Sequence, residues 1–250
     1  MSLEGKRVLV IGGSRGIGAA IVATLVRDGA RVALHYGKSR AAAARLAEEL
    51  DGAPVLLGAD LADVGAGLAL VARAEDALGG LDGVVNNAGM FASAPPTAPW
   101  ADWVRVWQET LQVNLVAAAD ITRAALPTFQ HQRRGTFVYI ASRAAFRGDD
   151  PEYLAYAASK GGVVALTKSV ARGYGRDGVA AMAVAPGFVA TEMAQRVADE
   201  QGTSALVADI PLGEMAKPAD VAAVVAFLLS DHARHLNGAT VDINGGSYVR

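Results

Sequence analysis

The most informative stretch of the sequence reads Arg7-Val8-Leu9-Val10-Ile11-Gly12-Gly13-Ser14-Arg15-Gly16-Ile17-Gly18, and an apolar helical pattern follows it as far as Val26. A short apolar strand, a glycine-rich turn and a helix in this order aim free backbone N–H groups at a phosphate. The glycines at 13, 16 and 18 have the spacing G-x-x-x-G-x-G, which differs from the G-x-G-x-x-G of the longer dinucleotide fingerprint. Two interpretations are open at this point: a phosphate-binding turn, or glycines that only let a strand and a helix pack closely.

The rest of the chain alternates short apolar runs with helical patterns. The runs that read as strands cover 31–36, 54–59, 83–86, 136–141, 179–185 and 239–243, and the first helical patterns between them cover 39–50 and 63–78. Short, nearly continuous apolar strands separated by helices are typical of a parallel sheet that is buried on both faces. We therefore predict an α/β fold that forms a single domain over residues 1–250.

The composition fits such a domain and excludes several classes of function. Of the 250 residues, 52% are hydrophobic and 19% are charged, and the formal net charge is −2. This balance gives no indication of nucleic acid or an anionic membrane as a partner. The chain has no cysteine, so it can form neither a disulfide nor a thiolate site. We expect a cytoplasmic protein, because the first residues do not resemble a signal peptide and no apolar run is long enough to span a membrane.

A second informative pattern, Tyr156-Ala157-Ala158-Ser159-Lys160, lies where a helix is expected to start. Residues four apart share one helical face, so the ammonium of Lys160 can approach the phenol of Tyr156. A free tyrosine has a pKa of about 10, and a nearby positive charge lowers that pKa toward the range useful for proton transfer. The pair predicts a proton donor or acceptor for an alcohol or carbonyl oxygen. The alternative is a chance pairing of a packed ring with a solvated ammonium.

Two other groups of side chains are expected to have no chemical role. Trp100, Trp103 and Trp107 recur at helical spacing, and we interpret them as core or subunit contacts rather than as a base-stacking platform. His232 and His235 are three residues apart, but no carboxylate completes a ligand set, so no metal site is expected.

Taken in order, five motifs resemble those of the short-chain dehydrogenase/reductase family over essentially the whole chain. They are Gly13-x-x-x-Gly16-x-Gly18, Asn86-Asn87-Ala88-Gly89, Asn114, Ser142 and Tyr156-x-x-x-Lys160. The resemblance implies a doubly wound Rossmann-type sheet of about seven parallel strands, with NAD(P) lying across the carboxyl ends of the strands. It also implies a homotetramer; the apolar run 221–229 and the edge strand near 241–243 fit this expectation.

The resemblance assigns positions that would bind the cofactor. The glycine turn would line the pyrophosphate, the second strand end would meet the adenosine phosphate, and later segments would contact the adenine, its ribose and the nicotinamide: Gly13, Ser14, Arg15, Gly16, Ile17, Gly18, Tyr36, Lys38, Asp60, Leu61, Asn87, Ala88, Gly89, Tyr156, Lys160, Pro186, Gly187, Val189 and Thr191. Asp60 could instead cap a helix, although Asp63 is better placed for that. Asn86 and Asn87 could be structural amides that tie neighbouring strands together.

The resemblance also assigns four catalytic residues. Ser142 would bind the substrate oxygen, Tyr156 would exchange its proton, Lys160 would lower the tyrosine pKa and hold the nicotinamide ribose, and Asn114 would hold a water molecule. Ser159 needs no special role. One departure is that Ser142 and Tyr156 are fourteen residues apart, where relatives commonly have about thirteen. The unusual loop between them, with Arg143 and residues 146–151, is expected to reshape substrate access and to leave catalysis intact.

The cofactor is expected to be NADP(H) in preference to NAD(H). An NAD site usually offers an acid after the second strand, roughly twenty residues beyond the glycines, for the ribose 2′-hydroxyl. Here residues 31–47 contain neither Asp nor Glu. Arg15, Lys38 and Arg40 are available as charge-assisted donors to a 2′-phosphate.

These observations predict an NADP(H)-dependent oxidoreductase that acts on a small-molecule carbonyl or secondary alcohol, covered by a segment at about 188–217. A 3-oxoacyl thioester on an acyl carrier protein is one candidate substrate, with Arg133 and Arg134 as basic residues where such reductases tend to be basic. Small ketones, sugars, steroids and quinones are the alternatives, and the same groups run the reaction in either direction. A non-catalytic dinucleotide-binding regulator is the competing class, which the complete catalytic set disfavours.

Overall fold

The computed structural model describes residues 2–192, 194, 195, 199 and 202–250. Its centre is a parallel sheet of seven strands in the order β3-β2-β1-β4-β5-β6-β7. The strands are β1 (Arg7–Ile11), β2 (Arg31–Tyr36), β3 (Val55–Gly58), β4 (Gly83–Asn86), β5 (Gly135–Ile140), β6 (Val179–Pro186) and β7 (Thr240–Ile243). Because β1 pairs with both β2 and β4, the strand order reverses there, and a doubly wound sheet binds its ligand at the carboxyl end of this position. The predicted doubly wound α/β sheet is confirmed.

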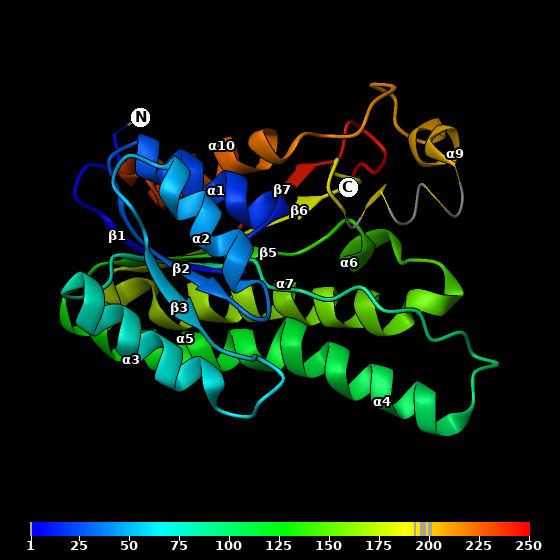
Figure 1. Cartoon of the computed structure of the whole chain (residues 1–250), viewed down its shortest axis with the longest axis horizontal. Helices are drawn as coiled ribbons and strands as arrows, with labels where there is room; N and C mark the ends of the chain where they lie inside the picture. The colour runs from blue at the N-terminus through cyan, green and yellow to red at the C-terminus, as the bar shows by residue number, and fades with distance from the viewer. Residues whose placement is uncertain (1, 193, 196–198, 200–201) are drawn as a thin grey trace.

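Helices cover both faces of the sheet (Figure 1). One face carries α1 (Gly16–Arg27), α2 (Arg40–Glu49) and α10 (Pro218–Leu229), and the other carries α3 (Ala66–Leu78), α4 (Trp100–Leu111), α5 (Ala117–His131) and α7 (Leu154–Tyr174). Shorter pieces are the π-helix η1 (Gln112–Val116), α6 (Ala144–Arg147), α9 (Thr203–Ala208) and the 3₁₀ turns η2 (Pro151–Tyr153), η3 (Gly175–Asp177) and η4 (Asp231–Leu236).

Alternate residues of each strand pack into different apolar clusters. In β1, Leu9 and Ile11 belong to the cluster shared with α3, α5 and α7, whereas Val8 and Val10 belong to the cluster shared with α1 and α10. Successive side chains of a strand point to opposite faces, so a strand buried on both faces must be apolar throughout. This two-sided burial explains why the strands read as unbroken apolar runs.

Some local predictions were inaccurate. Helix α3 begins at Ala66 and not at residue 63, because Gly65 precedes it as N-cap with a left-handed φ of 80°, so Asp63 does not cap this helix. On α4, Trp103 and Trp107 are half-buried with their rings 5.7 Å apart, while Trp100 is 76% exposed. Among the residues described here, no helix is both long and apolar enough to cross a membrane.

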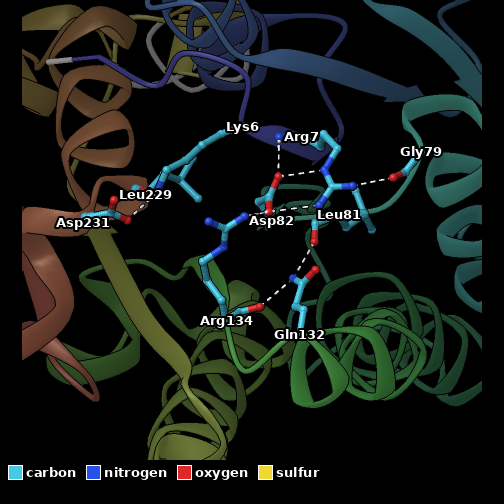
Figure 2. Close-up of polar contacts among 9 residues, drawn as sticks. All are labelled: Lys6, Arg7, Gly79, Leu81, Asp82, Gln132, Arg134, Leu229 and Asp231. Atoms are coloured by element: carbon cyan, nitrogen blue, oxygen red, sulfur yellow. Dashed lines mark hydrogen bonds and ion pairs between the residues drawn. The ribbon is translucent and has the colours of Figure 1, made fainter.

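A buried carboxylate joins the amino ends of the central strands (Figure 2). The glycine turn lies at the other, carboxyl, end of these strands. Asp82, just before β4, accepts hydrogen bonds from the backbone N–H of Arg7 at 3.0 Å, from its Nε at 2.8 Å and from Nη2 of Arg134 at 2.6 Å. Arg134 therefore has a structural role at the start of β5. Burial alone would raise the pKa of Asp82, but the bonds from Arg7 and Arg134 outweigh it and hold the pKa at about 2.

Replacing Asp82 by Asn should lower the free energy of unfolding by about 2 kcal/mol at neutral pH, because it leaves the Arg7 and Arg134 guanidiniums without their shared anion. The native-state pKa of Asp82 is depressed, so its stabilisation is complete above the unfolded-state pKa of about 4 and is lost as the pH falls toward 2. Urea unfolding at several pH values should therefore show the difference between wild type and Asp82→Asn shrinking below about pH 4. Asp231→Asn, which removes the exposed partner of Lys6, is the control and should change stability little. A difference independent of pH would contradict the assignment.

Candidate active site

The glycine turn lies at the carboxyl end of β1, where backbone segments approach one another closely. A Cβ on Gly18 would lie only 2.0 Å from the carbonyl oxygen of Gly12, and Gly12 itself has a φ of 72°. Helix α1 begins at Gly16 with no side-chain cap and no acidic residue in its first turn. Its first N–H groups are therefore available, and the helix dipole favours an anion there. This geometry supports the phosphate-binding interpretation over mere close packing.

His35 fixes this turn from β2, a role that was not predicted from the sequence. Its buried ring accepts a hydrogen bond from the N–H of Gly12 through Nδ1 at 3.0 Å, so Nε2 carries the proton and donates to the carbonyl of Ala59, also at 3.0 Å. Burial lowers the pKa of His35, which favours this neutral form. The backbone carbonyl of His35 also accepts from the N–H of Gly13 at 2.8 Å. A single histidine in an otherwise apolar strand was the available signal.

Asn86 is the last residue of β4, and Asn87 and Gly89 follow it beside the same turn. Asn87 donates from Nδ2 to the carbonyl of Gly12 at 2.9 Å, which gives it the structural role considered from the sequence. Within the described part of the chain, the buried amide of Asn86 has no hydrogen-bond partner. A Cβ on Gly89 would lie 3.3 Å from Nζ of Lys160 and 3.6 Å from Oδ1 of Asn114. The absence of a side chain at 89 therefore leaves room beside two of the predicted catalytic residues.

Asn114 and Lys160 are buried and tightly held. Asn114 lies in the π-helix η1, where its Oδ1 accepts from the N–H of Met90 at 2.8 Å and its Nδ2 donates to Oγ of Ser159 at 3.0 Å. Ser159 donates in turn to the carbonyl of Tyr156 at 2.7 Å, so it connects η1 to the first turn of α7. The sequence had given Ser159 no role. Lys160 donates to the carbonyl of Ile140 at 2.8 Å, and burial lowers its pKa to about 8.

Ser142 and Tyr156 meet across the site. Ser142 follows β5, is buried, and accepts a hydrogen bond from the N–H of Ala144 at 3.1 Å. Burial raises the pKa of Tyr156 to about 12, while its hydrogen bond with Ser142 acts in the opposite direction. The expectation that Lys160 brings this pKa close to neutrality is wrong for the protein as described. Nζ of Lys160 lies 5.7 Å from the centre of the Tyr156 ring, and a buried phenolate loses its hydration. The phenol is consequently protonated at neutral pH.

The last predicted contact segment follows β6. Gly187 packs against Asn244, where a Cβ would lie 2.9 Å from the asparagine Cβ, and the buried Val189 forms a parallel β-bridge with Ala216. The side chain of Thr191 faces Gly16 of the glycine turn, with 3.3 Å between its methyl carbon and a Cβ placed on that glycine. The chain after Pro186 therefore reaches back to the start of α1. Part of the expected covering segment at 188–217 lies outside the described residues.

The remaining predicted cofactor residues lie at the carboxyl ends of β2 and β3. Tyr36 is half-buried and Lys38 is exposed, while Leu61 is buried and Asp60 is exposed. Oδ1 of Asp60 accepts from the N–H of Ala62 at 3.0 Å, so the carboxylate stabilises its own turn. Three further predicted residues lie at the glycine turn: Ser14 belongs to the turn itself, Ile17 belongs to the first turn of α1, and Ala88 contacts Gly12.

The exposed Arg15 guanidinium lies 3.6 Å from a carboxylate oxygen of Glu192. These positions surround the strand-order reversal, where open α/β sheets bind dinucleotides. Together with the half-buried Tyr156 and the buried Ser142 and Lys160, they define a class of protein: nicotinamide-dependent oxidoreductases.

Comparison with known proteins agrees with this class. A family model described as enoyl-(acyl carrier protein) reductase matches residues 11–248. A 3-oxoacyl-(acyl-carrier-protein) reductase of Staphylococcus aureus is 34% identical over 247 residues, 98% of each chain, and an L-rhamnose 1-dehydrogenase (NAD(P)(+)) of Azotobacter vinelandii is 35% identical over 258 aligned positions, 100% of this chain and 99% of that one. A solved short chain dehydrogenase from Burkholderia cenocepacia in complex with NADP is similar with a TM-score of 0.90, 35% identity and 99% coverage of both chains. The chain belongs to the short-chain dehydrogenase/reductase family of oxidoreductases.

Proposed function

We propose that this protein transfers hydride between NADP(H) and a carbonyl or secondary alcohol. The observation that carries the proposal is the meeting of Ser142, the protonated phenol of Tyr156 and the buried ammonium of Lys160 beside the glycine turn. The site has groups that can bind both the cofactor and the substrate. The N–H groups at the start of α1 can bind a pyrophosphate, and the two hydroxyls can donate hydrogen bonds to a substrate oxygen. NADPH supplies the hydride when bound.

In reduction, Ser142 and Tyr156 hold the carbonyl oxygen by hydrogen bonds, and Tyr156 donates its proton as negative charge develops there. The raised pKa of Tyr156 suits this direction because the phenol is still protonated at neutral pH. The ammonium of Lys160 stabilises the phenolate left behind and would donate to the nicotinamide ribose. Asn114 and Ser159 keep the first turn of α7 in place, so that Tyr156 and Lys160 face the same side.

NADP(H) is the preferred cofactor in this proposal. The end of β2 carries Lys38 and no acid, and Arg15 projects from the glycine turn with 61% of its side chain exposed. The similar Burkholderia cenocepacia dehydrogenase was solved with NADP, which supports the same choice here. Among the described residues, Arg15 forms an ion pair with the exposed carboxylate of Glu192 alone, and such a pair contributes little in water and leaves the guanidinium available to a phosphate.

Steady-state kinetics with a carbonyl panel should give a kcat/KM for NADPH at least about tenfold above that for NADH, which corresponds to one charge-assisted phosphate contact. The panel includes a 3-oxoacyl thioester, small ketones, a sugar, a steroid and a quinone. Arg15→Gln should reduce the preference by raising the KM for NADPH while leaving that for NADH unchanged. A higher kcat/KM with NADH would contradict the cofactor proposal, and no oxidation of either cofactor with any carbonyl would contradict the function itself.

The substrate lies beyond what the family determines. The curated relatives named above act on a thioester carried by a protein and on a sugar, although they share the fold. Arg133 and Arg134, which were considered as contacts for an acyl carrier protein, are bonded to Arg176 and Asp82 at the amino ends of the strands, away from Ser142. We propose that the segment at about 188–217 covers the substrate, since Phe188 and Met215 pack with Phe91 around Leu206, and Phe91 contacts Tyr156.

A homotetramer is the proposed assembly. Helix α10 buries one side against α1, and the partly exposed Val224 and Phe227 leave apolar surface on it. In the part of the chain that the structure describes, strand β7 is the last strand of the sheet and pairs with β6 alone, which leaves its other edge open. Such an edge and an apolar helix face favour association in water. Multi-angle light scattering at micromolar concentration should give four times the 25.7 kDa chain mass, and a monomer would contradict the proposal.

A further inference from the structure

Arg143 occupies an unusual place for a cation. It follows Ser142 directly, so the two Cα atoms are ~3.8 Å apart. Its N–H donates to the carbonyl of Pro186 at 2.9 Å, and its guanidinium lies over the ring of Phe188, 4.6 Å from the ring centre. Nη1 donates to Oγ of Ser247 at 2.7 Å. The side chain thus bridges the serine loop, the segment after β6 and the C-terminal loop, which Figure 1 shows beside α6.

This cation has no direct counter-ion in the described part of the chain. Arg7 and Arg250 each bond to a carboxylate within 3 Å, whereas no carboxylate oxygen of a described residue lies within 4.0 Å of Arg143. Of the five N–H groups of a guanidinium, one is used by Ser247. Asp149 and Asp209 act on Arg143 only at longer range, and both of these acids are exposed to water. Arg143 is half-buried, and burial lowers its pKa.

A series of apolar side chains in contact links Arg143 to the reacting centre. The ring of Phe91 stands edge-on to that of Tyr156 at 4.8 Å, and Phe91 and Phe188 pack around the same buried Leu206. Arg143 lies over the ring of Phe188, at the other end of this series of contacts. A fixed, partly dehydrated guanidinium beside packed apolar side chains binds a planar anion far better than a solvated one does.

We propose that Arg143 binds a carboxylate of the substrate, so that this enzyme reduces oxo acids or oxidises the matching hydroxy acids. The inference rests on the proposed function and specifies its substrate class. Ser142 and Tyr156 would hold the reacting oxygen while the neighbouring Arg143 holds the carboxylate a few bonds away. Neutral sugars, steroids and quinones would leave the guanidinium without its partner, at a cost in the affinity of the productive complex.

The test compares acids with their uncharged esters. NADPH oxidation is measured with pyruvate and methyl pyruvate, and with acetoacetate and methyl acetoacetate, beside the neutral members of the carbonyl panel. For at least one pair, we expect the acid to have a kcat/KM at least about tenfold above its ester, as one charge-assisted contact provides. Arg143→Met should abolish that preference by raising the KM for the acid at least about tenfold, with the ester changed by less than about threefold. Arg143→Lys, a point charge without the fork, should be intermediate.

Two controls separate binding from folding. Arg147→Met removes an exposed guanidinium from the short helix α6, of which Arg143 is the N-cap, and should keep the acid preference. NADPH affinity, followed by fluorescence, should be unchanged in Arg143→Met. If the wild type reduces neutral carbonyls but favours no acid over its ester, or if Arg143→Met retains the preference, the inference is overturned while the proposed function stands. If no carbonyl of any kind is reduced, the proposed function fails and the inference fails with it.

Discussion

Replacing Tyr156 by Phe is expected to lower kcat by at least about a hundredfold, the lower end of what general acid–base catalysis contributes. The ring is half-buried and contacts Phe91, and Phe keeps both the ring and that contact. Only the hydroxyl that bonds with Ser142 is lost. Folding and NADPH binding should therefore be nearly unchanged, because neither depends on that proton.

The control is Tyr174→Phe, which removes a phenol from the far end of the same helix α7. It should leave kcat within about twofold of the wild type, since a surface or boundary change has small effects. Both variants are compared by stopped-flow oxidation of NADPH on a carbonyl that the wild type reduces. Near-normal turnover of Tyr156→Phe would mean that another group donates the proton.

Replacing Lys160 by Met is expected to lower kcat and to weaken NADPH binding together. Lys160 is buried with its ammonium bonded to the carbonyl of Ile140, so Met fills most of the same space without the charge. The loss of the charged hydrogen bond that we propose between Lys160 and the ribose should raise the Kd for NADPH at least about tenfold. The loss of the charge beside Tyr156 should lower kcat further, because the developing phenolate loses a stabilising neighbour.

The pH dependence distinguishes this role from a structural one. The pKa of Lys160 is lowered to about 8, so its ammonium is charged below that pH and loses its proton above it. NADPH affinity of the wild type should be constant at lower pH and should weaken as the pH rises through 8, whereas Lys160→Met should lack this limb. Lys168→Met, which removes an exposed ammonium two turns further along α7, should behave as the wild type. A wild-type affinity that does not change between pH 7 and pH 10 would contradict the role of Lys160.

The sequence was sufficient to predict the α/β sheet, because strands that are buried on both faces must be apolar throughout and therefore appear as continuous apolar runs separated by helical patterns. The doubly wound arrangement of about seven parallel strands followed from the resemblance, whereas the glycine turn was visible in the sequence as a strand, a glycine-rich turn and a helix. Helix ends were less certain. Asp63 looked like a cap, but Gly65 adopts the left-handed conformation that ends the preceding turn, and a helix start depends on such backbone geometry.

Long-range contacts in the site were not accessible from the sequence. Ser159 and His35 each form a hydrogen bond with a residue that is distant in the chain. Ser159 bonds to Asn114, and His35 bonds to the carbonyl of Ala59. The pKa of Tyr156 was misjudged because the sequence shows that Lys160 is near but not that the fold removes water from around the phenol and so raises its pKa. The charge of Arg143 was visible, whereas its position on Phe188 without a carboxylate partner among the described residues required the fold.

Transfer of deuterium tests the central claim most directly. NADPH carrying deuterium at both hydrogen positions of the nicotinamide C4 is incubated with the wild type and a carbonyl that it reduces, and the alcohol is examined by mass spectrometry. Direct hydride transfer predicts an alcohol with one deuterium on the former carbonyl carbon, formed at least about a hundredfold more slowly by Tyr156→Phe. Oxidation of NADPH without deuterium in the alcohol would contradict hydride transfer in this site.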